Sequence, residues 1–166
     1  VMFSFDGRRI VTASSDQTAR IWDAANEAPP LVLTGHRAWV YSASFSADGL
    51  YVLTASEDGS ARLWDSTTGA ELARFTGHSA GILDAEFSPD AALLVTAGLD
   101  GLARIRYTQR GNSMTLLSGH ENSVFGAQFS PDGRHILTAS LDATVRTWDV
   151  GSGALRETER SHAGGV

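Results

Sequence analysis

The chain has 166 residues, of which 42% are hydrophobic and 19% charged, and its mean hydropathy of −0.10 indicates one globular domain rather than a disordered or membrane-spanning segment. Acidic residues outnumber basic ones by 19 to 13, and the net charge of −6 opposes binding to the phosphate backbone of a nucleic acid. The chain contains no cysteine and no lysine, which excludes disulfides, thiolate metal sites, P-loop lysines and Schiff bases.

In chain order, the sequence predicts short β-strands separated by turns. A turn at Asp6-Gly7 precedes the apolar run 8–14 (RRIVTAS), and a further strand is expected at 19–22 (ARIW). A polar loop follows, and then the run 31–36 (LVLTGH). Later runs with the same character lie at 50–56, 73–78, 115–120 and 134–140. No segment has a helical period long enough to predict a helix.

These elements recur with a constant spacing of 42 residues. The Gly-His dipeptide places histidines at 36, 78 and 120, and a degenerate Ser-His copy ends at His162. The Trp-Asp dipeptide keeps the same register at Trp22, Trp64 and Trp148, whereas the third copy has Arg106. The chain is therefore interpreted as a single domain, 1–166, with repeat units at approximately 1–36, 37–78, 79–120 and 121–162.

Each repeat predicts one four-stranded antiparallel sheet with both faces covered. Adjacent apolar residues such as Val52-Leu53 break simple alternation, as expected for a strand buried on both sides. Four such strands with a period near forty describe one blade of a β-propeller. The predicted fold class is all-β, with four propeller blades that form either a partial ring or half of a dimeric eight-bladed ring.

The pattern GH…FSPDG…TASxDG…xRxWD resembles the WD-repeat family over essentially the whole chain. The resemblance implies a structural hydrogen-bond network in each blade rather than one hydrolytic triad, because the residues recur. The implied members are Thr12, Asp16, Trp22, His36, Thr54, Asp58, Trp64, His78, Thr96, Asp100, His120, Thr138, Asp142 and Trp148. The first blade would take His162 if the ring closes, and Arg106 puts the third network in doubt.

The same resemblance implies that partners bind at one end of the ring. The positions concerned lie at the start of each innermost strand and immediately before the aspartate that recurs in each repeat. The candidate partner-binding residues are Trp39, Tyr41, Glu57, Leu83, Leu99, Phe125 and Leu141. Most are apolar at positions expected to face solvent, which favours a binding patch. The alternative is that Leu83 and Phe125 turn inward and fill a channel.

The stretch TGHSAG, residues 76–81, contains a G-x-S-x-G motif and makes Ser79 a candidate nucleophile of a hydrolase. That motif requires a strand that leads into a helix, whereas here one strand is expected to lead into another. The equivalent pentapeptides of the other repeats also lack this serine. Each repeat has only one Gly-His histidine, so no metal site and no cofactor are predicted.

The sequence thus predicts a non-catalytic scaffold or sensor module of a larger signalling assembly that binds a protein or peptide. The alternatives are a hydrolase using Ser79 and a purely structural repeat fragment. We do not expect the chain to bind nucleic acid, because it is acidic. We do not expect it to bind a membrane, because it lacks a long apolar run and a recognisable signal peptide. A second copy or further blades in a longer chain would complete the ring. The arginine- and alanine-rich composition resembles that of high-GC bacteria, and the lack of cysteine favours the cytoplasm.

Overall fold

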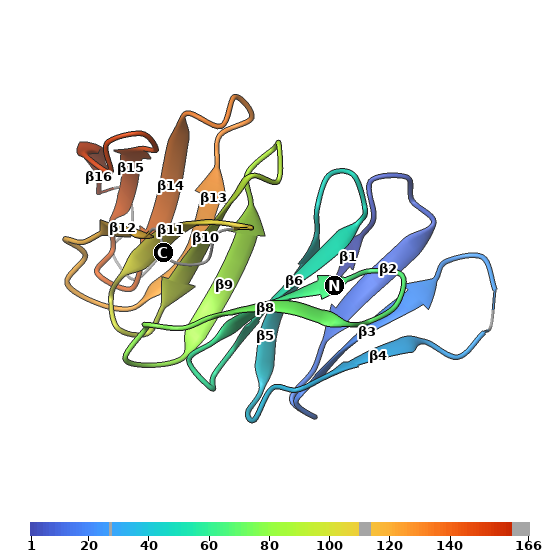
Figure 1. Cartoon of the computed structure of the whole chain (residues 1–166). Coiled ribbons are helices and arrows are strands. Elements are labelled where there is room, and N and C mark those ends of the chain that lie inside the picture. The colour runs from blue at the N-terminus through green and yellow to red at the C-terminus, as the bar shows by residue number, and fades with distance from the viewer. Residues whose placement is uncertain (27, 110–113, 161–166) are drawn as a thin grey trace.

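The computed structural model describes residues 1–26, 28–109 and 114–160, which form sixteen strands and no helix. Each successive group of four strands makes one antiparallel sheet in sequence order (Figure 1). The strands are β1 Met2–Phe3, β2 Arg9–Ala13, β3 Thr18–Asp23, β4 Leu31–Thr34, β5 Val40–Phe45, β6 Tyr51–Ser56, β7 Ala61–Asp65, β8 Glu71–Phe75, β9 Ile82–Phe87, β10 Leu93–Gly98, β11 Ala103–Tyr107, β12 Met114–Leu117, β13 Val124–Phe129, β14 His135–Ser140, β15 Val145–Asp149 and β16 Leu155–Glu159. The predicted all-β fold of four-stranded blades is confirmed. Among the described residues, no helix could cross a membrane.

The turn between the first two strands is built by a Ser-x-Asp-Gly pattern in the first, second and fourth blades, whereas the third blade has Ala91 at the glycine position, also with a positive φ of 55°. In the second blade the Ser46 hydroxyl donates to the Asp48 carboxylate at 2.6 Å, and the same carboxylate accepts the backbone N–H of Leu50 at 2.9 Å. Gly49 adopts a φ of 71°, a left-handed conformation that glycine enters without steric cost. The polar turn residues therefore fix the connection from β5 to β6.

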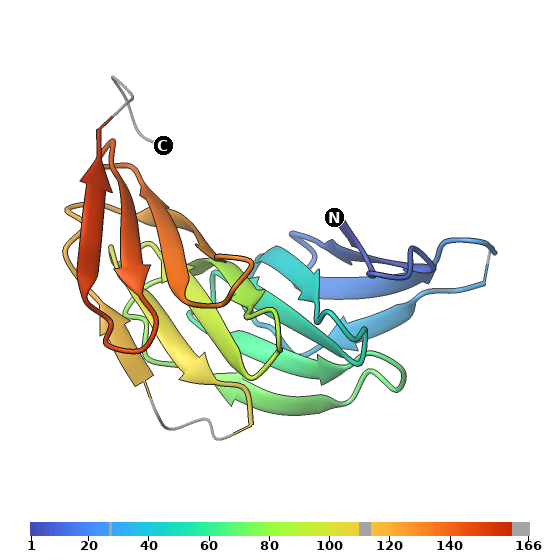
Figure 2. The same cartoon turned by 90° about the horizontal axis from the view of Figure 1, so that it is seen from above.

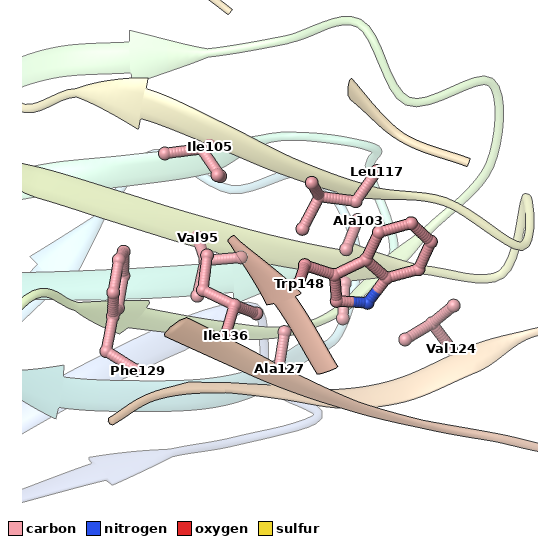
Figure 3. Packing of buried hydrophobic residues seen from close by; sticks show 10 residues of the cluster. Val95, Ala103, Ile105, Leu117, Val124, Ala127, Phe129, Ile136 and Trp148 are labelled. Atoms are coloured by element: carbon pink, nitrogen blue, oxygen red, sulfur yellow. The ribbon is translucent and has the colours of Figure 1, made fainter. Parts of the chain in front are cut away.

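Neighbouring blades pack face to face through apolar side chains. Between the third and fourth blades, Val95, Ile105 and Leu117 meet Phe129 and Trp148 (Figure 3). Similar buried clusters join the first blade to the second and the second to the third. Each large apolar side chain buried in this way contributes about 1.5–3 kcal/mol relative to an exposed one. The three interfaces hold the four blades in a fixed order.

The four blades follow one another along an open arc, with the first and last blades at its ends (Figure 2). The expectation that each blade is covered on both faces holds for the inner blades, where Leu53 and Val95 are fully buried. It is wrong for the fourth blade, whose equivalent residue, Leu137, is 48% exposed. No fifth blade lies against this face among the described residues, so its apolar positions meet solvent.

Candidate functional site

A buried hydrogen-bond network joins three segments of the second blade. His36 follows β4 and places Nδ1 3.0 Å from Oδ2 of Asp58 and Nε2 2.7 Å from Oγ1 of Thr54. Trp64 on β7 donates from Nε1 to the same Thr54 oxygen at 2.9 Å. Because the Asp58 carboxylate can only accept, the neutral imidazole carries its proton on Nδ1, and Nε2 accepts from the Thr54 hydroxyl. Every member thus has a matched partner.

The protonation states of the network follow from burial. Desolvation lowers the pKa of His36 below its ordinary value, although the hydrogen bond and charge of Asp58 act in the opposite direction. Burial also acts to raise the pKa of Asp58, but hydrogen bonds from Ser60, the Arg37 backbone and His36 outweigh it and bring that pKa well below the usual range. The pair therefore consists of a neutral imidazole and a carboxylate at neutral pH.

The fourth blade repeats this geometry closely. His120 lies 2.9 Å from Asp142 through Nδ1 and 2.7 Å from Thr138 through Nε2. Trp148 donates from Nε1 to Thr138 Oγ1 at 2.8 Å. Thr138 is fully buried, and Trp148 is buried against the preceding blade.

The third blade keeps most of the network despite its substitution. His78 still lies 2.8 Å from Asp100 and 2.9 Å from Thr96. Arg106, at the position of the tryptophan, is buried and donates from Nη2 to the backbone oxygen of Thr76. Burial and the adjacent Arg104 lower the pKa of this guanidinium. The network therefore survives the loss of the indole, but Thr96 loses the donor that the tryptophans supply elsewhere.

The first blade has only part of the arrangement. Trp22 donates to Thr12 at 3.0 Å, and Asp16 forms an ion pair with Arg20 at 2.7 Å. Among the described residues, no histidine bonds to Thr12 or Asp16. His162, the residue expected to serve the first blade, lies outside the described residues.

The glycine before each network histidine allows a close approach between blades. A Cβ atom on Gly35 would lie 2.4 Å from Nη1 of Arg62, and one on Gly119 would lie 2.6 Å from Nη1 of Arg146. Arg62 on β7 is buried and Arg146 on β15 is half-buried, and each lies near the aspartate of its own blade, with Arg62 at 3.9 Å from Asp58 and Arg146 at 3.8 Å from Asp142. The Gly-His dipeptide therefore combines a small residue at the contact with the imidazole of the network.

Matches to the family model "WD domain, G-beta repeat" cover residues 1–23, 28–65, 69–106 and 111–149. The chain belongs to the WD-repeat family. No curated protein sequence matches the chain. The first matched segment covers β1 to β3, and each later segment runs from the outermost strand of one blade to the third strand of the next, so the sequence repeat is offset from the blade by one strand. The third WD repeat is matched despite Arg106.

A β-bulge interrupts the pairing of the innermost strand in the second, third and fourth WD-repeat blades. The register shifts lie between Val40 and Ser42 in β5, at Leu83 in β9, and between Val124 and Gly126 in β13. Tyr41, Leu83 and Phe125 are the unpaired residues. A bulge of this kind re-aims a side chain that would otherwise stand on one face of the sheet. Sequence register alone identified these positions, but it did not reveal the bulge.

Direct contacts connect several of the predicted partner-binding residues, together with Gly81 and Ser123, from the second blade to the fourth. Trp39 packs edge-on against Tyr41, with ring centroids 6.4 Å apart, and its backbone oxygen accepts the N–H of Glu57 at 2.9 Å. The backbone N–H of Leu99 donates to the backbone oxygen of Gly81 at 2.9 Å. A Cβ atom on Gly81 would lie 3.1 Å from Cα of Glu57 and 3.4 Å from Cδ1 of Leu99, so the three residues are neighbours. Ser123 links the third blade to the fourth by donating to the backbone oxygen of Leu99 at 3.3 Å.

Most of the candidate residues are exposed in the open arc. Trp39 is 53% exposed and Phe125 45% exposed, and Tyr41, Leu99 and Leu141 are also exposed large hydrophobic residues. Glu57 is exposed as well. Leu83 differs from the expectation, because it is half-buried between its neighbours. We call the set Trp39, Tyr41, Glu57, Leu83, Leu99, Phe125 and Leu141 the apolar face.

Ser79 lies in the loop between β8 and β9, so a strand leads into another strand at the G-x-S-x-G motif. Its backbone N–H donates to Asp100 at 3.1 Å. The adjacent His78 is engaged with Thr96 and Asp100 through its two ring nitrogens. Among the described residues, the loop therefore offers Ser79 neither a helix start nor an available base.

The concave side of the arc holds a groove of about 660 Å³ that sequence reasoning missed. Asp84 and Glu86 on β9 line it together with apolar residues such as Phe45. Asp84 accepts a hydrogen bond from Ser42 at 2.9 Å, whereas burial and the neighbouring Asp84 charge raise the pKa of Glu86 to about 7. Within the described part of the chain, no three acidic or histidine side chains gather as metal ligands. At the positions equivalent to Asp84 and Glu86, the second and fourth blades have uncharged residues. This difference between repeats is the only feature of the sequence that points to the two acidic residues.

Proposed function

We propose that the chain is a non-catalytic recognition module that binds a protein or peptide on the apolar face. WD repeats generally serve as interaction scaffolds, and the role expected here is that of a scaffold or sensor within a larger, bacterial signalling assembly. The observation that carries the proposal is the row of bulged or loop-borne aromatic and aliphatic side chains that stay exposed on one end of three blades.

The chemistry of the apolar face indicates the kind of ligand. Tryptophan, tyrosine and phenylalanine supply large contact areas with few rotatable bonds, and such residues dominate binding energy at protein interfaces. Glu57 adds a negative charge at the edge of the face. A peptide with apolar side chains and a basic residue therefore fits this surface better than an acidic or wholly polar one.

Selection of a random peptide library displayed on phage tests the proposal. Peptides selected on the unmodified chain should lose at least about tenfold in affinity for the Trp39→Ala/Phe125→Ala variant, because each truncated ring removes more than about 1 kcal/mol at a central contact. Titration calorimetry with one selected peptide measures the change.

The matched control is Leu50→Ala/Tyr107→Ala. Both residues are exposed large hydrophobics, and they lie at the opposite ends of their blades from the apolar face. This control variant should bind the selected peptide as the unmodified chain does. Equal affinity of all three proteins for every selected peptide would show that the apolar face is not the recognition surface.

A further inference from the structure

One carboxylate in the groove on the concave side has no hydrogen-bond partner in the described part of the chain. Asp84 accepts hydrogen bonds from the Ser42 hydroxyl at 2.9 Å and from the backbone N–H groups of Ala85 and Ala127 at 3.0 and 3.3 Å. Glu86 lies two residues further along β9, is half-buried, and accepts none from the described residues. A polar group that loses water without gaining a partner is destabilised. Both oxygens of Glu86 are therefore available to a ligand.

The groove has no positive side chain that would balance its two acidic residues. Among the described residues that line it, Asp84 and Glu86 are charged, and none is an arginine, a lysine or a histidine. Burial and the charge of Asp84 raise the pKa of Glu86 to about 7, as expected for two neighbouring carboxylates without a cation. A positively charged group that enters the groove would therefore meet an unbalanced negative charge.

The acidic site lies in the middle of the arc and has a neighbour on each side. Glu86 is on β9, the innermost strand of the third blade, and β9 contacts β5 and β13 (Figure 1). The positions equivalent to Glu86 on those two strands are Ser44 and Gln128, and both line the same groove. The carboxylate is therefore flanked by uncharged polar residues of the second and fourth blades.

The size and lining of the groove fit a long side chain rather than a single ion. Its volume of about 660 Å³ lies within the range of about 300–1,000 Å³ that is common for ligand pockets. Apolar side chains such as Ala43 and Phe45 line it together with the two acidic residues. Arginine and lysine bury their methylene stems along apolar surface while the charged head contacts polar groups.

Tyr41 connects the groove to the apolar face. Its side chain belongs to the apolar face, and it also lines the groove. The next residue, Ser42, bonds to Asp84, and Glu86 lies about 7 Å further along β9 at the usual rise of a strand. A side chain that enters beside Tyr41 therefore passes Asp84 before it reaches Glu86.

We propose that the groove binds the arginine side chain of a peptide, with the guanidinium paired to the carboxylate of Glu86. This inference rests on the proposed function, because the apolar face would hold the rest of the same peptide. A guanidinium presents its N–H donors in a planar fork and can donate two parallel hydrogen bonds to one carboxylate. Calcium needs six to eight oxygen ligands, whereas both oxygens of Asp84 already accept hydrogen bonds.

NMR titration of the isotope-labelled chain with N-acetylarginine amide tests the groove without a peptide. The backbone signals of Glu86 and Gln128 should shift, and Glu86→Gln should weaken the binding at least about tenfold, because the charge-assisted pair is lost. N-acetylcitrulline amide has a similar shape without the charge and should cause no such shifts. Glu157→Gln is the matched control, because Glu157 is an exposed acid on β16 outside the groove, and this variant should bind as the unmodified chain does.

Three results of this titration would overturn the proposal. The first is the absence of shifts along β9, and the second is equal binding by the unmodified chain and the Glu86→Gln variant. The third is a shift of the same signals by calcium chloride but not by N-acetylarginine amide, which would assign the groove to a metal ion.

The proton on Glu86 gives a second measurement. A bound cation favours the ionised carboxyl, so the affinity for N-acetylarginine amide should rise about tenfold from pH 6 to pH 8, as a group with a pKa of about 7 loses its proton. Asp84 is the other charged side chain among the described residues of the groove, whereas Ser44 and Gln128 flank Glu86 without charge. An equal rise in the Glu86→Gln variant would contradict the pairing.

The groove and the apolar face can fail separately. Peptides selected on the unmodified chain should share an arginine, and its replacement by citrulline should weaken binding at least about tenfold on that chain but much less on the Glu86→Gln variant. Selected peptides that bind without an arginine would overturn the groove proposal and leave the proposed function intact. A chain that binds N-acetylarginine amide through Glu86 but selects no peptide would contradict the proposed function, while the pairing in the groove would stand.

Discussion

The hydroxyl of Thr54 is the shared atom of the network in the second blade, and its removal measures how much the network stabilises the fold. Thr54→Val replaces the hydroxyl with a methyl group of similar size and deletes both hydrogen bonds of Oγ1. Nε1 of Trp64 and Nε2 of His36 then lack partners in a site that water does not reach, since Thr54 is fully buried and Trp64 is 1% exposed.

The magnitude follows from the number of groups left without a partner. Each buried polar group that loses its hydrogen bond costs about 1–3 kcal/mol, so two groups predict a loss of about 2–5 kcal/mol in the free energy of unfolding. A loss of about 3 kcal/mol should lower Tm by about 6–12 °C in a domain of this size. Urea unfolding followed by circular dichroism measures the free energy, and calorimetry measures Tm.

Thr12→Val in the first blade is the matched control. Among residues 1–26, 28–109 and 114–160, the Thr12 side chain bonds only to Trp22, and both residues are half-buried, so water can replace the lost hydrogen bond. The expected loss is about 1 kcal/mol or less. If the two variants unfold with the same free energy, burial of the network does not determine its contribution, and the reasoning is refuted.

Two further substitutions address the residues that depart from the repeat pattern. Arg106→Trp should stabilise the fold by about 1–2 kcal/mol, because the indole N–H can donate to Thr96 and because a buried cation beside Arg104 is removed. A free energy of unfolding lower than that of the unmodified chain would contradict this prediction. Glu86→Gln should stabilise the fold near pH 8 by about 1–2 kcal/mol, after allowance for solvent access, and should have almost no effect near pH 4, below the ordinary pKa of the carboxyl. The sign follows because the folded state, with the pKa of Glu86 raised to about 7, binds more protons than the unfolded state, so its stability falls as pH rises from about 4.5 through 7. Urea titrations of both proteins at the two pH values check this, and a gain that is independent of pH would contradict it.

The repeat register predicted the architecture because each blade is specified by local signals. Turn residues such as Asp48 and Gly49 and paired apolar residues such as Val52 and Leu53 fix strand lengths and burial within about forty residues. The network partners were also readable, since the spacing between His36 and Thr54 recurs in the third and fourth blades.

Other features depend on the relation between blades and were not readable from one repeat. The bulges at Tyr41 and Phe125 arise from strand register, and the raised pKa of Glu86 arises from its burial beside Asp84. The exposure of Leu137 follows from its place at the end of the arc, although its sequence context matches that of buried Leu53. The repeat period therefore predicts the strands and turns of a blade, whereas the neighbouring blades determine which of its side chains are buried.

The network also has a direct connection to the proposed recognition surface. His36 anchors the start of the loop that carries Trp39, and the Asp58 carboxylate accepts the backbone N–H of Arg37 at 3.0 Å. The hydroxyl of Ser56 donates to the backbone oxygen of Ala38 at 3.3 Å, and the next peptide group is held by Glu57. Four consecutive loop residues are therefore fixed from the interior of the blade.

The same carboxylate-to-loop contact recurs from Asp100 to Ser79 at 3.1 Å and from Asp142 to Glu121 at 3.0 Å. A loop that is already ordered loses little conformational entropy when a ligand binds, so more of the contact energy appears as affinity. The buried residues of the network thereby hold in place the backbone that carries exposed side chains of the apolar face. Repetition of the network in successive blades is what a recognition surface spread over several loops requires, because each loop needs its own internal anchor.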